Sequence, residues 1–169
     1  ISKEKIQTAA TDLVLEGQLL MVLDHPHIVS VRGWAAGGPE AFLSGQLSDY
    51  FLILDRLPES LEDRMLLWRR KYAKYQKRLK RRLARRRASE KICSCLRSRI
   101  EERESRDPPD MDKYEIKLLT VLLDQLKAAR GIASAVAYMH SKRLIHRDLK
   151  LSNVGFDVQG DVKLFDLGL

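Results

Sequence analysis

The sequence predicts an α+β fold in which long helices accompany a few short strands. Residues 117–139 form a long apolar run with helical spacing, and residues 9–23 carry leucines at helical intervals. Two short apolar runs, 154–156 and 162–165, flank a turn that contains Gly160, which is the pattern of a β-hairpin. Two helices and a hairpin in a chain of 169 residues therefore indicate one mixed domain of ordinary size.

The N-terminal third predicts a helix followed by two strands. The sequence Asp24-His25-Pro26 ends the helix at 9–23, because proline disfavours helical backbone in the residue before it. Residues 28–34 and 50–55 are typical of short strands, and the second run is apolar enough to be buried. The Gly-, Ala- and Ser-rich residues 35–48 between them predict a loop.

A helix is predicted to begin at Ser60, whose hydroxyl suits an N-cap, with Glu62 and Asp63 in the first turn. Beyond it, residues 69–113 hold 18 of the 31 Lys and Arg but 7 of the 23 Asp and Glu. This segment carries a local charge of +11, whereas the rest of the chain carries −3. Its apolar residues are too sparse for a buried face, so it predicts a solvated helix or a disordered insertion.

Composition excludes several classes of protein. An apolar content of 44% argues against general disorder, and no apolar run approaches the roughly 18 residues of a membrane span. No signal peptide is visible. Cys93 and Cys95 cannot close a tetrahedral zinc site, so we expect two reduced thiols in an intracellular protein, cytoplasmic or nuclear.

Two short polar stretches lie at the ends of the predicted hairpin. Residues 146–153 read HRDLKLSN, and residues 166–168 read DLG. A rigid hairpin between them would hold both loops in fixed positions. Both loops carry the side chains that phosphoryl transfer requires.

That reaction needs a carboxylate that accepts a hydroxyl proton, metal ions, and a cation on the moving phosphoryl group. Asp148 can serve as the carboxylate and Lys150 as the cation. Asn153 and Asp166 offer hard oxygen ligands, which suit Mg²⁺. Gly168 would give the backbone conformational freedom after the metal-binding residue.

The two stretches resemble the catalytic loop and the metal-binding loop of the eukaryotic protein kinases, H-R-D-L-x-x-x-N and D-F-G. The first match is complete, and the second has Leu167 in place of Phe. Lys150, two residues after Asp148, is the serine/threonine-type pattern. The resemblance therefore implies ATP and Mg²⁺ as cofactors and a Ser or Thr hydroxyl of a protein as the acceptor. Arg147 implies an activation loop whose phosphate this arginine receives.

Residues 16–29 resemble the family's helix C and the turn after it. On that match Glu16 pairs with the lysine that positions ATP, although a solvated helix residue is the alternative. Leu20 would pack toward Leu167, with Val31 and His146 completing the stack.

Residues 50–55 resemble the strand that leads into the hinge between the two kinase lobes. Leu54 then occupies the gatekeeper position, with strand core as the alternative. The backbone of Asp55–Leu57 forms the hinge that pairs with the adenine edge. Gly155 stands where the family commonly has a larger residue under the adenine ring, which would loosen or reshape the nucleotide pocket.

The resemblance implies a two-lobed protein-kinase-like fold that is incomplete. Residues 1–57 correspond to part of the small lobe and the hinge, from helix C onward. Residues 58–68 and 114–169 correspond to helices D and E and the catalytic and metal-binding loops of the large lobe. Residues 69–113 are then a basic helical or disordered insertion.

Several parts of the family pattern are absent from the sequence, namely the Gly-rich loop, the ATP-positioning lysine and the A-P-E motif. Lys3 and Lys5 precede Glu16 by 13 and 11 residues, which is short for the family. We expect the lysine upstream of Ile1, and we expect the chain alone to transfer no phosphate.

Two alternatives remain open at this point. The first is a pseudokinase that serves as a scaffold. The second is binding of nucleic acid, acidic proteins or anionic lipid through residues 69–113, as an accessory property.

Overall fold

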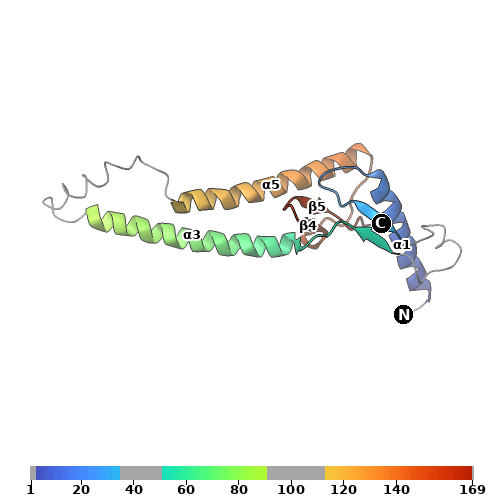
Figure 1. Cartoon of the computed structure of the whole chain (residues 1–169), viewed down its shortest axis with the longest axis horizontal. Coiled ribbons are helices and arrows are strands. Elements are labelled where there is room, and N and C mark those ends of the chain that lie inside the picture. Colours follow the sequence, from blue (N-terminus) through green and yellow to red (C-terminus); the bar gives the residue numbers. More distant parts are fainter. Residues whose placement is uncertain (1–2, 35–50, 91–112, 169) are drawn as a thin grey trace. The chain divides into compact units, whose positions relative to one another are not determined.

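The computed structural model of the chain describes residues 3–34, 51–90 and 113–168, which form two compact units (Figure 1). Unit 1 comprises residues 1–64 and 127–169, and unit 2 comprises residues 65–126. Two long helices, α3 (Leu61–Glu90) and α5 (Lys113–Ser141), contribute residues to both units. Within the described ranges, none of the helices has the length and apolarity that crossing a bilayer requires.

Some expectations lie outside the described residues. These are the loop at 35–48, Tyr50 at the start of the second predicted strand, the two cysteines, and the final part of the basic segment up to residue 112.

The first element of unit 1 is helix α1 (Lys3–Val22), which begins six residues before the predicted helix and ends where the sequence indicated. The chain leaves the helix before Asp24-His25-Pro26. Leu20 and Leu23 are buried at 2% and 7% exposure, because they share the helix face that packs on the rest of the unit.

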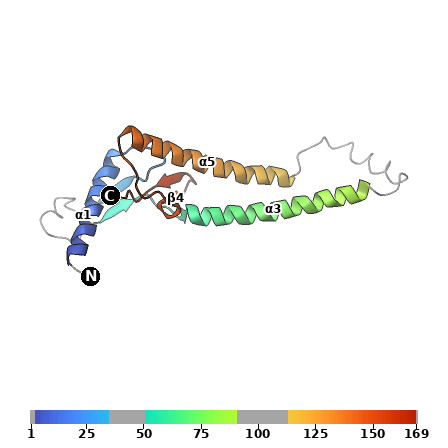
Figure 2. The ribbon, with the colours of Figure 1, turned by 180° about the vertical axis from the view of Figure 1, so that it is seen from behind.

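Two short strands follow, β1 (Val31–Trp34) and β2 (Leu52–Leu54), and they pair antiparallel (Figure 2). The strand predicted at 28–34 is therefore shorter than expected. The expectation that the second strand is buried is wrong, since Phe51 and Ile53 are 54% and 51% exposed. A two-stranded sheet leaves one face of each strand uncovered, so alternate residues meet solvent.

The predicted hairpin is confirmed. Strands β4 (Val154–Phe156) and β5 (Val162–Leu164) pair antiparallel, and β3 (Glu59–Ser60) adds to the free edge of β4. Four hairpin residues, at 0–3% exposure, form the centre of the unit 1 core: Val154, Phe156, Val162 and Leu164.

The turn of the hairpin is held by its own polar groups. The carboxylate of Asp157 accepts hydrogen bonds from the main-chain N–H groups of Gln159 and Asp161, at 3.0 and 2.8 Å. Gly160 has φ of +89°, a conformation that favours glycine. These local interactions fix the register in which the two strands pair.

The residues before β1 join the hairpin instead of extending that strand. The N–H of Val29 donates to the carbonyl of Leu164 at 2.9 Å, and the N–H of Leu164 donates to the carbonyl of His27 at 2.9 Å. Ile28 and Val29 are each 1% exposed as a result.

The C-terminal half of α5 packs closely on this hairpin. Ala128, Ala135 and Met139 are buried along one face of the helix. A Cβ at Gly131 would lie 2.4 Å from the Cγ1 of Val162, so only glycine permits this approach.

The segment between α1 and β1 is tied to the same helix. The N–H of Asp24 donates to the hydroxyl of Tyr138 at 3.1 Å, and the Nε2 of His25 lies 3.0 Å from the Oγ of Ser134. The rings of His25 and Tyr138 stack with centroids 5.1 Å apart. Helix α5 and helix α1 are therefore coupled through the chain that links α1 to the first sheet.

Helix α3 begins with the predicted N-cap. The hydroxyl of Ser60 accepts the N–H of Asp63 at 3.1 Å, and the Asp63 carboxylate accepts the N–H of Ser60 at 3.3 Å. The helix then continues without a break to Glu90. The boundary expected at residue 68 is therefore not a helix end. Of the two forms expected for the basic segment, a helix or a disordered insertion, residues 69–90 adopt the helix.

Unit 2 consists of the parts of α3 and α5 within residues 65–126. Trp68 and Val121 are each 4% exposed, and the ammonium of Lys117 lies 5.5 Å from the centroid of the Tyr75 ring. The apolar run at 117–139 is helical as predicted, but this part of it is not buried throughout. Four leucines of this part of α5 are 45–56% exposed: Leu119, Leu122, Leu123 and Leu126.

Candidate active site

The loop between α5 and the hairpin brings together three of the predicted site residues. One oxygen of the Asp148 carboxylate, Oδ2, accepts hydrogen bonds from the Nζ of Lys150 at 2.5 Å and from the Nδ2 of Asn153 at 3.0 Å. The Asp148 side chain is 46% exposed, and that of Lys150 is 51% exposed. The carboxylate is thus oriented by two donors while it remains open to a partner from outside.

Asn153 is the anchor of this group. It is 3% exposed, and its Nδ2 also donates to the main-chain carbonyl of Asp148 at 3.0 Å. The main-chain carbonyl of Asn153 accepts the N–H of Phe165 at 3.1 Å, which ties the end of the first loop to the second. The amide nitrogen is engaged on Asp148, whereas the Oδ1 of Asn153 accepts only a long hydrogen bond from the hydroxyl of Ser152, at 3.4 Å. This oxygen is therefore the side-chain atom for which a ligand could compete.

Asp148 and Lys150 form an ion pair in which each group favours the charged form of the other. The hydrogen bond from Lys150 lowers the pKa of Asp148 below its ordinary value, and the same hydrogen bond raises the pKa of Lys150. Both groups are therefore charged near neutral pH. An ionised Asp148 can accept a proton or a hydrogen bond from a hydroxyl.

The second loop is joined to the first through one carbonyl. The carbonyl of His146 accepts the N–H of Asp148 at 2.8 Å and the N–H of Gly168 at 3.0 Å. The two loops are thus held together by backbone hydrogen bonds as well as by the hairpin.

Gly168 is required for a reason other than the predicted backbone freedom. A Cβ at this position would lie 2.9 Å from the Cβ of Asp148, 3.2 Å from its main-chain nitrogen and 3.3 Å from the carbonyl oxygen of His146. The expectation that glycine serves conformational freedom is corrected to one of close approach: no side chain fits between the loops.

Two residues of these loops have left-handed backbone. Arg147 has φ of +63° and Asp166 has φ of +59°. Aspartate tolerates this region better than most residues, whereas arginine at such a position is uncommon, and such conformations concentrate at functional sites. The backbone therefore turns sharply on either side of the contact between the two loops.

Glu16 of α1 reaches the second loop. Its Oε1 accepts the N–H of Leu167 at 3.0 Å, which fixes that loop to the helix. Burial raises the pKa of Glu16 above its ordinary value, and the negative charge of Asp166 adds to the increase. A carboxylate in this position lacks a compensating cation among the described residues.

Lys3 and Lys5 cannot supply that cation. Both lie with Glu16 on the single helix α1. The helical rise places their backbones about 16–20 Å from Glu16, well beyond the reach of a lysine side chain. The lysine that would pair with Glu16 remains a prediction.

The four residues of the predicted stack are buried or half-buried, as packing against one another would require. Leu20, Leu167 and His146 are 2%, 5% and 4% exposed, and Val31 is half-buried. Neither ring nitrogen of His146 has a hydrogen-bond partner among the described residues. The direct contacts of the stack stay a prediction.

The predicted hinge is held by the Asp55 carboxylate. It accepts the N–H of Ser30 at 3.1 Å and the Nε of Arg32 at 2.6 Å, and the Nζ of Lys163 lies 3.9 Å away. Burial acts to raise the pKa of Asp55, but the hydrogen bonds from Ser30 and Arg32 outweigh it and lower the pKa. The side chain is thus engaged inside the protein, and the N–H of Asp55 donates to the carbonyl of Ser30 at 3.1 Å, so the main-chain carbonyl is the polar group of Asp55 left to meet a ligand.

Gly155 is buried, and its open side is filled by the hinge. A Cβ at Gly155 would lie 2.9 Å from the Cδ1 of Leu57 and 3.3 Å from the carbonyl oxygen of Glu59. Leu57 therefore occupies the space that a larger residue at 155 would take. Leu54, the predicted gatekeeper, is half-buried. Whether a nucleotide pocket here is loosened or reshaped stays a prediction.

The residues available for a metal ion are few. No group of three or more His, Cys, Asp or Glu side chains suited to a metal occurs in the described part of the chain. Magnesium is commonly held by one or two protein oxygens together with substrate phosphates. The Oδ1 of Asn153, which accepts a 3.4 Å hydrogen bond from Ser152, and the exposed carboxylate of Asp166 fit that arrangement.

Sequence reasoning missed the residues that orient the hinge. Lys163 is 13% exposed and lies 3.9 and 3.8 Å from the carboxylates of Asp55 and Asp157. The alternation of the strand, with polar Lys163 between buried Val162 and Leu164, was the available signal. Nothing local in the sequence indicates that Asp55, more than 100 residues earlier, is its partner.

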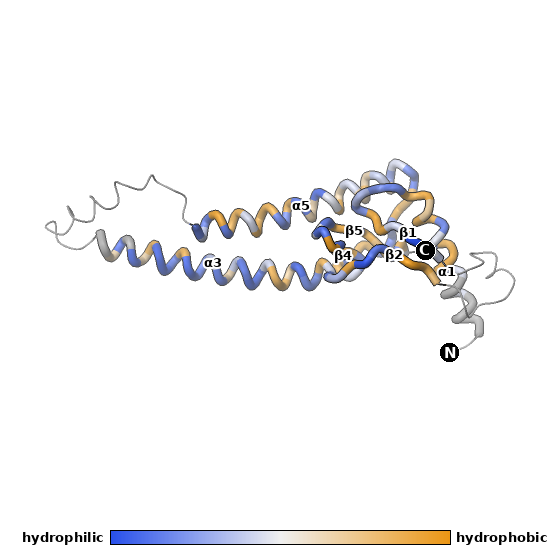
Figure 3. Tube along the Cα trace, in the orientation of Figure 1, coloured by the Kyte–Doolittle hydropathy of each residue, from blue (hydrophilic) through white to orange (hydrophobic). Residues whose placement is uncertain are grey.

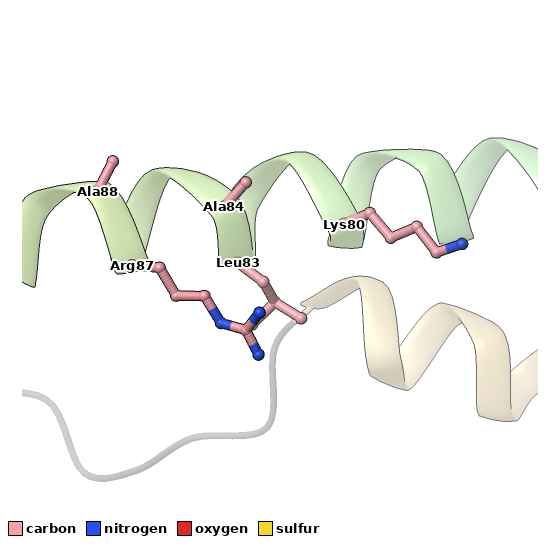
Figure 4. A pocket seen from close by; sticks show the side chains of 5 residues that line it. All are labelled: Lys80, Leu83, Ala84, Arg87 and Ala88. Carbon is pink, nitrogen blue, oxygen red and sulfur yellow. The ribbon is translucent and has the colours of Figure 1, made fainter.

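A hollow of about 410 Å³ lies elsewhere, against α3 in unit 2 (Figure 4). Its lining consists of Lys80, Leu83, Ala84, Arg87 and Ala88. None of the predicted site residues lines it, so it is separate from the loops described above.

Comparison with known proteins identifies the family. The chain matches the family model "Protein kinase domain" over residues 1–169. The chain therefore belongs to the protein kinase domain family, and the predicted α+β, protein-kinase-like fold is confirmed. Members of this family use ATP and Mg²⁺ in general.

Short stretches resemble individual kinases. The chain is 52% identical over 40 residues to NUAK family SNF1-like kinase 2 of Homo sapiens, which covers 24% of this chain and 6% of that protein. It is 50% identical over 46 residues to the probable serine/threonine-protein kinase ifkC of Dictyostelium discoideum, covering 27% and 3%. It is 55% identical over 38 residues to the cell cycle serine/threonine-protein kinase CDC5/MSD2 of Saccharomyces cerevisiae, covering 22% and 5%. The chain thus spans only 3–6% of the length of these relatives.

Proposed function

We propose that the chain forms part of the catalytic domain of a serine/threonine protein kinase, which transfers the γ-phosphoryl group of ATP to a Ser or Thr hydroxyl of a protein. The observation that carries this proposal is the carboxylate of Asp148, which is oriented by Lys150 and Asn153 and remains open to solvent. The names of the relatives, two of which include "serine/threonine-protein kinase", agree with it.

Asp148 would orient the acceptor hydroxyl and take its proton, because its lowered pKa keeps it ionised and its hydrogen bonds from Lys150 and Asn153 both go to Oδ2, so that no described residue occupies Oδ1. Lys150 would stabilise negative charge on the transferring phosphoryl group. The ion pair of these two residues places the proton acceptor next to the cation, as the reaction requires.

Asn153 and Asp166 would provide oxygen ligands to Mg²⁺, which neutralises phosphate charge when bound. The short link between the two residues, through the carbonyl of Asn153 and the N–H of Phe165, keeps their separation fixed. The hinge backbone at Asp55–Leu57 would meet the adenine, with Leu57 above Gly155 shaping the floor of that site. Glu16 would pair with the ATP-positioning lysine.

The test uses the natural polypeptide that carries this sequence, expressed and assayed with labelled ATP, Mg²⁺ and a library of Ser-, Thr- and Tyr-containing peptides. We expect labelling of Ser and Thr peptides only. The Asp166→Asn variant should abolish the labelling while its thermal unfolding stays near that of the wild type, because the Asp166 side chain is exposed. The 169-residue chain alone should not label any peptide.

A pseudokinase scaffold is the competing function. It would be indicated by a folded natural polypeptide that binds nucleotide in a thermal-shift assay but labels no peptide of the library. Labelling of Tyr peptides instead would contradict the serine/threonine assignment. A polyanion partner for the basic segment is a second and independent candidate, favoured by the exposure of the basic side chains of α3.

A further inference from the structure

Helix α3 concentrates positive charge far beyond what solubility requires. Residues 69–90 contain 12 Lys and Arg and a single acidic residue, Glu90. Residues 69–90 all belong to the continuous helix α3, and Figure 3 shows that this part of the helix is mostly hydrophilic. A net charge of magnitude about 2–8 suffices for the solubility of a whole small domain. Phosphoryl transfer makes no use of this charge.

The contacts inside unit 2 identify the side of α3 that faces α5. The ammonium of Lys117 lies over the ring of Tyr75, and the guanidinium of Arg78 lies over the ring of Tyr114, at 5.5 and 6.0 Å from the centroids. A stripe with helical spacing on this side is buried or half-buried: Trp68, Lys71, Tyr75, Leu79 and Arg82. We call this stripe the inner face.

The opposite side of α3 carries a straight row of cations. Successive helical residues are about 100° apart, so positions i, i+4, i+7 and i+11 form one stripe. Starting from Arg70, this stripe consists of Arg70, Lys74, Lys77 and Arg81, and all four are exposed. We call these four residues the outer basic row. It is about 16 Å long at a rise of about 1.5 Å per residue.

The side chains beside the outer basic row include small ones, and none of the residues from 69 to 88 is acidic. Ala73 lies beside the row, and Ala84 and Ala88 follow its end on the same side of the helix, where Figure 4 shows them pointing away from α5. Arg69 and Lys80 lie beyond the alanines on the other side. The outer side of the helix thus carries closely spaced cations, and the apolar side chains among them are alanines.

This combination fits nucleic acid better than other anionic partners. Insertion into a membrane interface needs large apolar side chains, and protein interfaces depend on aromatic and apolar anchors. The described side chains of the outer basic row and its flanking alanines include none, and the exposed Tyr72 and Leu83 lie on another side of the helix at about 100° per residue. Phosphate backbones need only cations in a line. The leucines exposed on α5 point away from α3, because they lie opposite Tyr114, Lys117 and Val121 on their helix.

The form of nucleic acid follows from the width of the helix. The major groove of B-form DNA is about 12 Å wide and admits an α-helix, with phosphates on both sides of it. The major groove of A-form RNA is too narrow and deep for side chains to read. We propose that the outer side of α3 binds double-stranded B-form DNA, with the outer basic row on one phosphate strand and the small side chain of Ala73 toward the groove.

The test compares two variants of the 169-residue chain that lose the same charge from opposite sides of one helix. The outer variant is Arg70→Gln, Lys77→Gln and Arg81→Gln, and the inner variant is Lys71→Gln, Arg78→Gln and Arg82→Gln. Fluorescence anisotropy with a labelled 20-bp DNA duplex of mixed sequence gives the Kd between 50 and 200 mM KCl. Glutamine retains helix propensity, and far-UV circular dichroism verifies the helix content of each variant.

We expect the outer variant to bind at least about tenfold more weakly at 100 mM KCl, and its salt slope to fall by about 3, since each phosphate contact contributes about one unit. The inner variant should change the Kd by less than about threefold. If either triple variant loses helix content, the single pair Lys77→Gln and Lys71→Gln replaces it, and the outer substitution should again weaken binding more.

Equal weakening by the two variants would show that only total charge matters and would overturn the assigned face. Absence of binding at 50 mM KCl would overturn the proposal as a whole. Binding of a 20-bp RNA duplex, or of vesicles containing phosphatidylserine, as tightly as the DNA duplex would overturn the choice of partner. Displacement of the DNA by an equal charge of polyglutamate would do the same.

Discussion

Gly168 packs directly against Asp148, so closely that a Cβ on the glycine would lie 2.9 Å from the Cβ of the aspartate. Both residues donate their N–H groups to the carbonyl of His146. The separation of the loop at 146–153 and the loop at 166–168 is therefore set by the absence of a side chain at position 168. Any larger residue there must displace the main chain of Asp148.

Substitution Gly168→Ala should destabilise the chain by about 1–3 kcal/mol, the usual cost of overpacking, and should lower turnover of the natural polypeptide at least about tenfold. Thermal unfolding and a kinase assay measure the two effects. Gly33→Ala is the matched control, because a Cβ there would meet only the Cδ1 of Ile53 at 3.7 Å. Equal effects of the two substitutions would contradict the close approach at Gly168.

Substitution Glu16→Gln should affect stability and activity in different directions. Burial raises the pKa of Glu16, so the folded chain favours the protonated form and its stability falls as pH rises through that pKa. Neutral glutamine keeps an oxygen for the N–H of Leu167, and the melting temperature of the 169-residue chain at pH 7.5 should stay equal or rise.

Turnover of the natural polypeptide should nevertheless fall at least about tenfold with Glu16→Gln, because the ion pair with the ATP-positioning lysine is lost. A melting temperature several degrees lower would mean that Glu16 already has a cationic partner in the folded chain. Unchanged turnover would remove Glu16 from the site.

The stability of the chain should depend on His25 at mildly acidic pH. Burial lowers the pKa of His25, helped by the nearby His27 and Lys163. Its Nδ1 accepts the N–H of His27 at 3.1 Å, so a proton on that nitrogen breaks the hydrogen bond. The unfolded chain binds this proton more readily, so stability is complete above the ordinary histidine pKa of about 6.5 and is lost as pH falls toward the lower folded pKa.

Melting temperatures measured between pH 5 and 8 test this dependence. The wild type should lose stability below about pH 6.5, and His25→Gln should flatten that part of the curve. His140→Gln, on an exposed histidine of α5, should leave the slope as it is in the wild type. An unchanged slope in His25→Gln would show that another group senses the pH.

The sequence allowed the elements with local signals to be predicted. The hairpin followed from two apolar runs around Gly160, and the start of α3 followed from Ser60 and Asp63, whose reciprocal hydrogen bonds involve only neighbours in the chain. Asp148, Lys150 and Asn153 were found because one loop carries all three. Local chemistry of this kind is readable without knowledge of the remaining fold.

Features that depend on distant partners could not be predicted in the same way. Val29 joins β5 through Leu164, and no pattern near residue 29 indicates a partner 135 residues later. Leu57 fills the space at Gly155, which is visible only when the hinge is placed on the hairpin. The position at which α3 ends could not be predicted either. The basic residues after 68 have good helix propensity whether they continue the helix or belong to a separate segment.

The most direct test of the proposed catalytic role is the turnover number of the Asp148→Asn variant of the natural polypeptide, measured together with its affinity for ATP. Asparagine keeps the shape of the side chain but cannot accept the proton. The account predicts a fall in turnover of at least about 100-fold, with the ATP affinity within about threefold of the wild type. Turnover within about tenfold of the wild type would contradict the role of Asp148 as the proton acceptor.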